Sequence, residues 1–277
     1  MCKVIYKIIK ASTKLQDFIK DYLLLHFIFD QKSIIPIKPF PANTDHCLVF
    51  YLRGSVTAFE SKSGISKIFP KISVNASQIS RFDFHLSHSY LMLSVNFKPQ
   101  GLSKFLRLPL TEFIDERIDA ETILNPEIHQ VHERMANTNC YEGILQIVED
   151  YLWKRIQCLK TESSALDDVI HLISENPYAQ SVEKMASYAC LSISQFERRF
   201  MQQIGITPKL FARINRFYQA YQLKDRYQNV DWLSIALQTG YHDYQHLVKD
   251  FKQFSNTTPH TLLMAQSQAP ERILGLG

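Results

Sequence analysis

The chain has 277 residues, of which 45% are hydrophobic and 12% aromatic, so it can form packed cores, and its length favours two domains. The formal net charge of +4 is nearly balanced, and no low-complexity tract is present. Composition alone therefore excludes a disordered or strongly charged chain and does not by itself indicate a nucleic-acid partner.

Membrane and metal functions are disfavoured at the outset. The longest clearly apolar run, Tyr22–Phe29, is interrupted by His26 and is too short to cross a bilayer. The first ten residues alternate charged with apolar side chains and lack the features of a signal peptide. Five scattered cysteines form no CxxC pair, which favours a reducing cytoplasm and disfavours a cysteine zinc site. We expect a cytoplasmic protein with no membrane partner, no metal and no cofactor.

Residues 1–160 are predicted to form an α+β domain. Leu15–Phe29 carries apolar residues at helical spacing and predicts a first helix. After Gly101 the pattern is again helical, and Tyr141–Leu159 is predicted as one long closing helix. Between them, turn signals separate short β-branched and aromatic segments, which predict strands at Cys47–Leu52, Val56–Glu60, Ser66–Phe69, Gln78–Phe84 and Tyr90–Phe97. These elements favour a small β-sheet or barrel with flanking helices.

Candidate chemistry in this domain is sparse. His46, His85 and His88 could start a metal site, but no carboxylate or cysteine has matching spacing, and ordinary surface or hydrogen-bonded histidines are the simpler interpretation. No Ser-His-Asp spacing, phosphate loop or nucleophile elbow occurs, so no catalytic residue is predicted. Six aromatic residues could line an apolar pocket or simply form core: Phe50, Tyr51, Phe59, Phe82, Phe84 and Tyr90.

The last hundred residues contain one helix-turn-helix pattern twice, and Ser181–Pro208 is the first copy. Ser181 and Ser192 are good N-caps for two short helices, and Gln195 completes a capping box with Ser192. Gly205 suits the left-handed position that ends the second helix. Val182, Met185, Ala186 and Ala189 form one apolar face of the first helix. Phe196 and Phe200 are an i,i+4 pair on the second helix that is expected to bury against it.

Asp231–Pro259 is the second copy, with an offset of 51 residues between Phe200 and Phe251. Asp231 and Asp243 are its N-caps, and Asn256 takes the left-handed position of Gly205. The face of its first helix is formed by Trp232, Ile235, Ala236 and Thr239, and Leu247 and Phe251 are the buried pair of its second helix.

Between the copies, Thr207 caps a bridging helix whose first residue is Pro208 and which extends to about Lys224. Seventeen helical residues give a rod of about 25 Å. Such a rod could hold two recognition helices roughly one DNA turn, about 34 Å, apart.

One pattern connects these positions: Met185-Ala186, Leu191-Ser192, Phe196-x-Arg198-x-Phe200, Gly205-x-Thr207-Pro208, Phe211, Arg216, Ala220, Leu223, Ile235-Ala236, Gly240-Tyr241, Asp243, Leu247-x-Lys249-x-Phe251-Lys252 and Thr258-Pro259. With it, residues 164–265 resemble the DNA-binding domain of the AraC/XylS family of transcription regulators. The departures are Lys249 where Arg is usual, Asp250 beside it, Asn256 in place of Gly, and Cys190 at a turn that often takes Gly. Asp250 argues against phosphate contact near it.

The resemblance implies DNA contacts on the first recognition helix, at about residues 192–204. Ser194, Glu197 and Arg198 match base-facing positions; an arginine can bind guanine O6 and N7, and a glutamate can accept from cytosine N4. Gln195 lies on the same solvent side, and Arg199 is expected to contact phosphate.

On the second recognition helix, at about residues 243–255, Tyr244, Gln245 and Lys249 match base-facing positions, and Gln245 could pair with adenine. His246 and Lys252 are better placed for phosphates. For each of these residues the simpler interpretation is a solvated helix face. From Lys184 to Lys252 there are ten basic and five acidic residues, which predicts a moderate salt dependence of DNA binding.

Pro41–Leu52 and Phe97–Gly101 resemble the amino-terminal domain of a subset of AraC-like regulators. In that family the domain usually senses an effector, dimerises, or does both, often on a cupin-like barrel. A small-molecule effector, a homodimer, and RNA polymerase for an activator are therefore the implied partners besides double-stranded DNA. The alternative is a domain that only dimerises or binds a protein.

The sequence thus favours a transcription regulator that binds the DNA major groove and is modulated by its amino-terminal domain. An enzyme with a DNA-targeting domain is the first rival, and DNA-repair alkyl transferases are an example. They need a metal-activated cysteine cluster or a Pro-Cys-His-type site, and neither occurs here. A partner-binding module without DNA affinity is the second rival, and the intact Arg198 and Lys249 argue against it.

Overall fold

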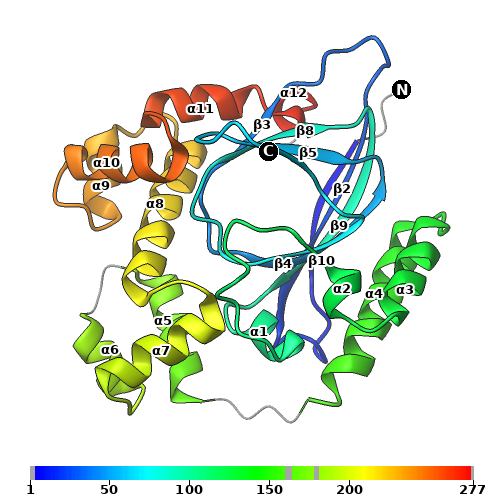
Figure 1. The fold of residues 1–277 in the computed structure, drawn as a ribbon. Helices are drawn as coiled ribbons and strands as arrows, with labels where there is room; N and C mark the ends of the chain where they lie inside the picture. The colour runs from blue at the N-terminus through cyan, green and yellow to red at the C-terminus, as the bar shows by residue number, and fades with distance from the viewer. Residues whose placement is uncertain (1–3, 160–163, 178–180, 276–277) are drawn as a thin grey trace.

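In a computed structural model, which describes residues 4–159, 164–177 and 181–275, an N-terminal β-sheet domain is followed by a helical C-terminal domain (Figure 1). The predicted α+β and all-α classes are confirmed. The predicted division near residues 160–163 lies outside the described residues.

Two antiparallel sheets make up the β part. One has six strands in the order β1 (Val4–Lys10), β2 (Ile19–Ile28), β9 (Ser89–Phe97), β4 (His46–Arg53), β7 (Ile72–Asn75) and β10 (Ile118–Asp119). The other has four in the order β3 (Lys38–Phe40), β8 (Phe82–Leu86), β5 (Val56–Glu60) and β6 (Ser66–Ile68).

The prediction of a helix at Leu15–Phe29 is wrong, because most of this segment is strand β2. β2 pairs with β1 on one side and with β9 on the other, with Leu24 opposite both Lys7 and Leu93. It is covered on both faces, so its apolar residues form a near-continuous run that does not alternate with polar ones. Such a run fits helical spacing as well as a buried strand.

Strands β1 and β7 were not predicted, and the strand expected at Gln78–Phe84 begins later, at Phe82. Residues 76–81 instead form a connection in which Gln78 makes an isolated β-bridge with Asn43. Strands β4, β5, β6 and β9 match their predicted positions to within one residue at each end.

The six-stranded sheet lies between two cores. Successive side chains of each strand point to opposite faces of the sheet, so neighbouring residues belong to different cores. In β4, Leu48 and Phe50 face a core shared with the helices, whereas Val49 and Tyr51 face the core between the two sheets. The helical cover consists of α1 (Gly101–Leu106), α2 (Ala120–Ile123), α3 (Glu127–Ala136) and α4 (Tyr141–Ile156). Helix α4 confirms the predicted closing helix.

The C-terminal domain has its own core, built on α5 (Ala165–Glu175), α6 (Val182–Tyr188), α7 (Ile193–Ile204), α8 (Pro208–Arg226), α9 (Trp232–Gln238), α10 (Tyr244–Ser255), α11 (Pro259–Ser267) and α12 (Pro270–Ile273). Its largest fully buried side chains are phenylalanines, and Phe217 of α8 packs edge-on against Phe251 of α10 with ring centroids 4.8 Å apart. In Figure 1, α8 stands between the α5–α7 group and the α9–α10 group.

Candidate nucleic-acid interface

Helix α7 begins and ends as its sequence predicts. The Ser192 hydroxyl accepts from the Gln195 backbone N–H, and the Gln195 side chain accepts from the Ser192 N–H, each at 3.3 Å. Gly205 ends the helix with a φ of +92°. Phe196 and Phe200 are fully buried, so the opposite face of α7 is left to solvent.

Helix α10 repeats this design with different residues. The Asp243 carboxylate accepts from the His246 backbone N–H at 2.7 Å, and Asn256 ends the helix with a φ of +53°. Leu247 and Phe251 are fully buried. Cys190 takes a left-handed φ of +55° in the first turn, and Gly240 one of +76° in the second, so the cysteine adopts the backbone that a glycine would take.

All ten predicted DNA-contact residues are exposed, five on each recognition helix: Ser194, Gln195, Glu197, Arg198, Arg199, Tyr244, Gln245, His246, Lys249 and Lys252. Within the described residues, Arg198 forms no ion pair or hydrogen bond through its side chain. The Gln195 side-chain oxygen serves the cap of α7, and the His246 imidazole lies 3.7 Å from the Asp243 carboxylate. The Gln195 side chain is therefore already engaged locally.

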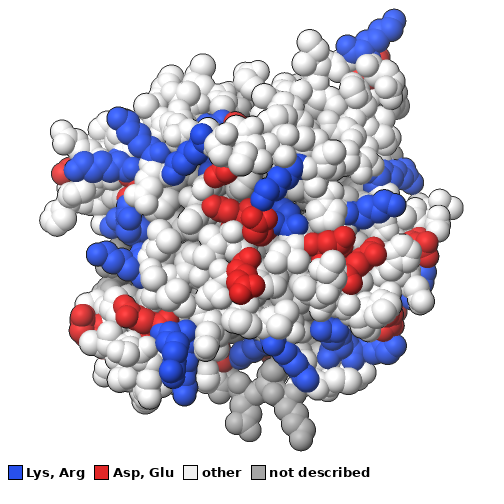
Figure 2. Space-filling model, in the orientation of Figure 1, with Lys and Arg blue, Asp and Glu red and all other residues white. Residues whose placement is uncertain are grey.

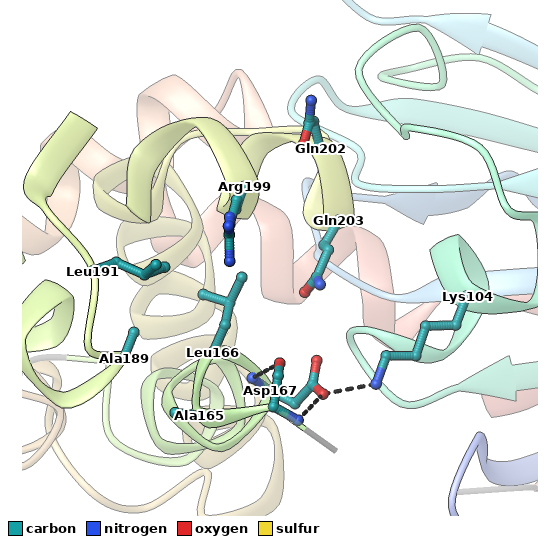
Figure 3. A pocket seen from close by; sticks show the side chains of 10 residues that line it. Lys104, Ala165, Leu166, Asp167, Ala189, Leu191, Arg199, Gln202 and Gln203 are labelled. Carbon is teal, nitrogen blue, oxygen red and sulfur yellow. Dashed lines mark hydrogen bonds and ion pairs between the residues drawn. The ribbon is translucent and has the colours of Figure 1, made fainter. Parts of the chain in front are cut away.

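Arg199 lies apart from Arg198, in a groove of about 460 Å³ between α1, α5 and α7 (Figure 3). Its side chain points toward Leu166 of α5, and Gln203 points into the same groove. On the far side, Asp167 accepts from the Lys104 ammonium at 2.7 Å, which joins α5 to α1 of the N-terminal domain. The sequence did not indicate this groove, because Lys104 of α1 and Asp167 of α5 on its far side lie far apart in the chain.

Asp250 is not on the exposed face of α10, where its charge would oppose DNA phosphates. It is 4% exposed and accepts from Arg213 at 2.5 Å, from Arg216 at 3.2 Å and from the Tyr241 hydroxyl at 3.1 Å. Burial and the neighbouring carboxylate raise the pKa of Tyr241, so the phenol stays a proton donor. The carboxylate that the sequence suggested would oppose phosphate is thus buried against two guanidinium groups of α8.

Helix α8 follows the first helix-turn-helix unit in the chain and precedes the second. Thr207 caps it and Pro208 is its first residue, as predicted, and its nineteen residues give roughly 28 Å of length. Near its first turn Phe211 packs edge-on against Phe200 of α7. The Asp250 cluster joins the helix to the second unit.

The known helix-turn-helix domain family matches the chain over residues 185–265, a span that begins within α6 and contains both recognition helices and the whole of α8. The C-terminal domain is an AraC-type helix-turn-helix domain. A Haemophilus influenzae protein described as an uncharacterized HTH-type transcriptional regulator is 35% identical over 79 residues, which are 28% of this chain and 26% of that protein. The chain thus matches about a quarter of that relative's length.

Among solved structures, the apo form of a ToxT variant from Vibrio cholerae covers 93% of this chain and 99% of its own, with 11% identity and a TM-score of 0.48. ToxT from Vibrio cholerae bound to an unsaturated fatty acid covers 88% of this chain and 95% of its own, with 12% identity and a TM-score of 0.48. Likenesses at this level carry no information on function.

Charge on the AraC-type domain is concentrated rather than large. In Figure 2 the left flank, over α8–α10, shows mainly Lys and Arg, whereas carboxylates gather in the middle of the same face.

Within the described residues, no helix combines the length and apolarity required to cross a bilayer.

A second cavity, of about 380 Å³, lies where the two sheets meet α8, α11 and α12 of the AraC-type domain. Three of the six aromatic residues suggested by the sequence, Tyr51, Phe84 and Tyr90, line it. Phe50 and Phe59 point away from the cavity, because each lies on the face of its strand that is turned from it. Phe50 packs beneath the helices, and Phe59 is 38% exposed. Phe82 packs between the sheets outside the lining.

Arg117 lines this cavity, and the contacts of its guanidinium are neutral oxygens and an aromatic ring. Its guanidinium donates to the Gln78 side-chain oxygen at 2.6 Å and to the Glu116 carbonyl at 3.2 Å, and it lies 5.3 Å from the Phe69 ring centroid. It forms no ion pair within the described residues. Burial lowers the pKa of Arg117, because a charged group is less stable away from water.

The three histidines do not converge. His46 is buried with Nε2 3.3 Å from the Ser77 hydroxyl, His85 packs against Phe59, and His88 bonds the Ser33 carbonyl. Among the described residues, no group of three or more His, Cys, Asp or Glu side chains is arranged to hold a metal ion.

Proposed function

We propose that the chain is a sequence-specific transcription regulator whose helices α7 and α10 enter successive major grooves of DNA. One observation carries the proposal: two helix-turn-helix units with N-caps, left-handed C-caps and buried pairs at equivalent positions are joined by a single helix. The match of this region to a helix-turn-helix domain family supports DNA binding in general. That the two helices enter major grooves, which operator they bind, and which residues contact it are all parts of this proposal.

In this proposal, Ser194, Glu197 and Arg198 read bases from α7, and Tyr244, Gln245 and Lys249 read them from α10. Lys252 and Arg199 supply phosphate contacts, and Arg199 must leave its groove beside α5 to do so. Gln195 contributes mainly by holding the start of α7, because its side chain is engaged there. His246 supplies a further phosphate contact. Helix starts are themselves favourable sites for phosphate.

Removal of the Arg198 guanidinium tests the assignment. Arg198→Ala is expected to weaken binding to a selected site by about 1–3 kcal/mol and to relax selectivity at one base pair. Fluorescence anisotropy on probes from a random-pool selection measures both effects. Arg53→Ala, an exposed arginine of the N-terminal domain, is the control. An Arg198 variant that retains wild-type affinity and base preference would contradict the assignment.

We further propose that the cavity beside Arg117 takes a small effector with an apolar body and an acidic group. Phe27, Phe69 and Tyr90 offer the apolar surface, and Arg117 offers a cation without a carboxylate partner. An unsaturated fatty acid, the ligand of the ToxT structure described above, has this chemistry. Homodimerisation, a cytoplasmic location and contact with RNA polymerase stay predictions.

Calorimetry with a fatty acid and its alcohol tests the effector. The acid is expected to bind roughly tenfold more tightly than the alcohol, and Arg117→Gln should abolish that difference. Equal binding of acid and alcohol to the unmodified protein would exclude Arg117 as the anchor.

A further inference from the structure

The C-terminal ends of both recognition helices are capped by the N-terminal domain. At the end of α7, the Leu110 N–H donates to the Gln202 carbonyl at 2.9 Å, and the Ser77 hydroxyl donates to the Ile204 carbonyl at 3.0 Å. The last carbonyls of a helix have no partner within the helix, so these donors satisfy groups that would otherwise need water.

The end of α10 is capped in the same way. The Ala42 N–H donates to the Phe254 carbonyl at 3.0 Å, and the Arg81 guanidinium donates to the Ser255 carbonyl at 3.4 Å. Ile204 and Ser255 are 51 residues apart, so they occupy the same position of the internal repeat. Asn256 adds a bond from its side chain to the Ser61 carbonyl at 3.2 Å.

Three of these four donors, Ser77, Ala42 and Arg81, belong to one connected piece of the N-terminal domain. The Asn43 N–H donates to the Gln78 carbonyl at 3.0 Å, and the Gln78 N–H returns a bond to Asn43 at 2.9 Å. The Gln78 side chain also donates to the carbonyls of Phe40 and Pro41. We call residues 40–44 and 76–81 the brace; Ala42, Asn43, Ser77 and Gln78 within it are buried.

The brace also reaches the middle of the bridging helix. The Thr44 hydroxyl donates to the Asn215 side-chain oxygen of α8 at 2.7 Å. The two helix-turn-helix units are therefore connected by two routes, through α8 and through the brace. Figure 1 shows the ends of α7 and α10 turned toward the N-terminal domain, with their starts directed away from it.

We propose that the brace sets the spacing of the two recognition helices, and that Ser77 and Arg81 are positioning residues for DNA binding. This inference rests on the proposed function, because it concerns how the same two helices meet DNA. A single helix fixes the distance between its ends but permits bending along its length. A second connection that holds both helix ends removes that freedom.

The first test does not involve DNA. Hydrogen exchange is measured for the full chain, for Ser77→Ala and for Arg81→Ala. Ser77→Ala removes the bond to the end of α7 together with the His46 contact, and Arg81→Ala removes the bond to the end of α10 together with the Asp83 ion pair. We expect faster exchange at the other helix end as well: at the Ala42 N–H in Ser77→Ala, and in Arg81→Ala at the Leu110 N–H, which reports on the end of α7. Loss of protection confined to the altered end would overturn the brace, whether or not the protein binds DNA.

The second test uses DNA probes whose two half-sites are moved apart by one or two base pairs. The double variant Ser77→Ala, Arg81→Ala is expected to lose affinity about tenfold for the natural spacing, and to discriminate less than the unmodified protein among spacings. Its affinity for a single half-site should stay unchanged. The control Ser87→Ala, Arg53→Ala removes the same residue types at positions outside the brace.

A spacing preference in the double variant equal to that of the unmodified protein would overturn the positioning role, as would a rise in its affinity. If the double variant fails to fold, Asn256→Gly replaces it, since glycine accepts the left-handed backbone and removes only the two side-chain bonds to Ser61. If the unmodified protein selects no DNA, the proposed function fails while the exchange test still decides the brace.

Discussion

At the scale of single residues, local chemistry was predictable and distant partners were not. Ser192, Gly205 and Asn256 have the predicted roles, because an N-cap or a left-handed residue is determined by neighbours a few positions away. Asp250 and Ser77 were not understood from the sequence, since the groups that they bind lie 34 and 127 positions away. A carboxylate beside Lys249 therefore suggested repulsion of DNA when it is in fact buried and neutralised.

His46 makes stability depend on pH. It is 1% exposed beside the Ser77 hydroxyl, and burial lowers its pKa to about 4 from an ordinary value of 6.5. The unfolded chain therefore binds more protons between these values, so stability is complete above pH 6.5 and falls as pH decreases toward 4. The expected loss is up to about 3 kcal/mol.

Urea unfolding at several values between pH 7.5 and 4.5 measures this loss. His46→Gln should flatten the profile, whereas His85→Gln, at an exposed ring, should leave its slope unchanged. An equal slope in the His46 variant and the unmodified protein would show that other groups cause the pH dependence.

At the scale of elements, amphipathic helices were more predictable than the buried strand. Helices α7, α8 and α10 each have one apolar face and a capping residue, and their predicted limits hold to within about two residues. Strand β2 lies between two neighbours with both faces covered, so it lacks the alternation that identifies a strand. Strand β7 has four residues, too few for a clear pattern.

The junction between α8 and α10 depends on the carboxylate of Asp250. Asp250→Asn leaves Arg213 and Arg216 without their counter-charge, and we expect a loss of about 2–3 kcal/mol in unfolding free energy, because breaking a buried pair leaves the partner uncompensated. Thermal unfolding measures the change, with Asp168→Asn as the control at an exposed position. A melting temperature equal to that of the control would contradict this role.

At the scale of the whole molecule, the sequence indicated two parts but not how they meet. The brace contacts join Ala42, Thr44, Ser77 and Arg81 to groups more than 120 positions away in the chain, and three of their four acceptors are backbone carbonyls, which carry no signature in the sequence. The cavity is likewise formed by side chains from both parts, including Tyr51 and Tyr221. Because Asn43 and Ala76 line that cavity and belong to the brace, a ligand there would touch the piece that holds both recognition helices.

The central claim is that α7 and α10 bind successive major grooves on one side of DNA. Hydroxyl-radical footprinting of the chain on a selected operator tests it most directly. We predict two protected patches centred about ten base pairs apart, of which Arg198→Ala weakens one and Lys249→Ala the other. A single protected patch, or two patches that both variants weaken equally, would contradict it.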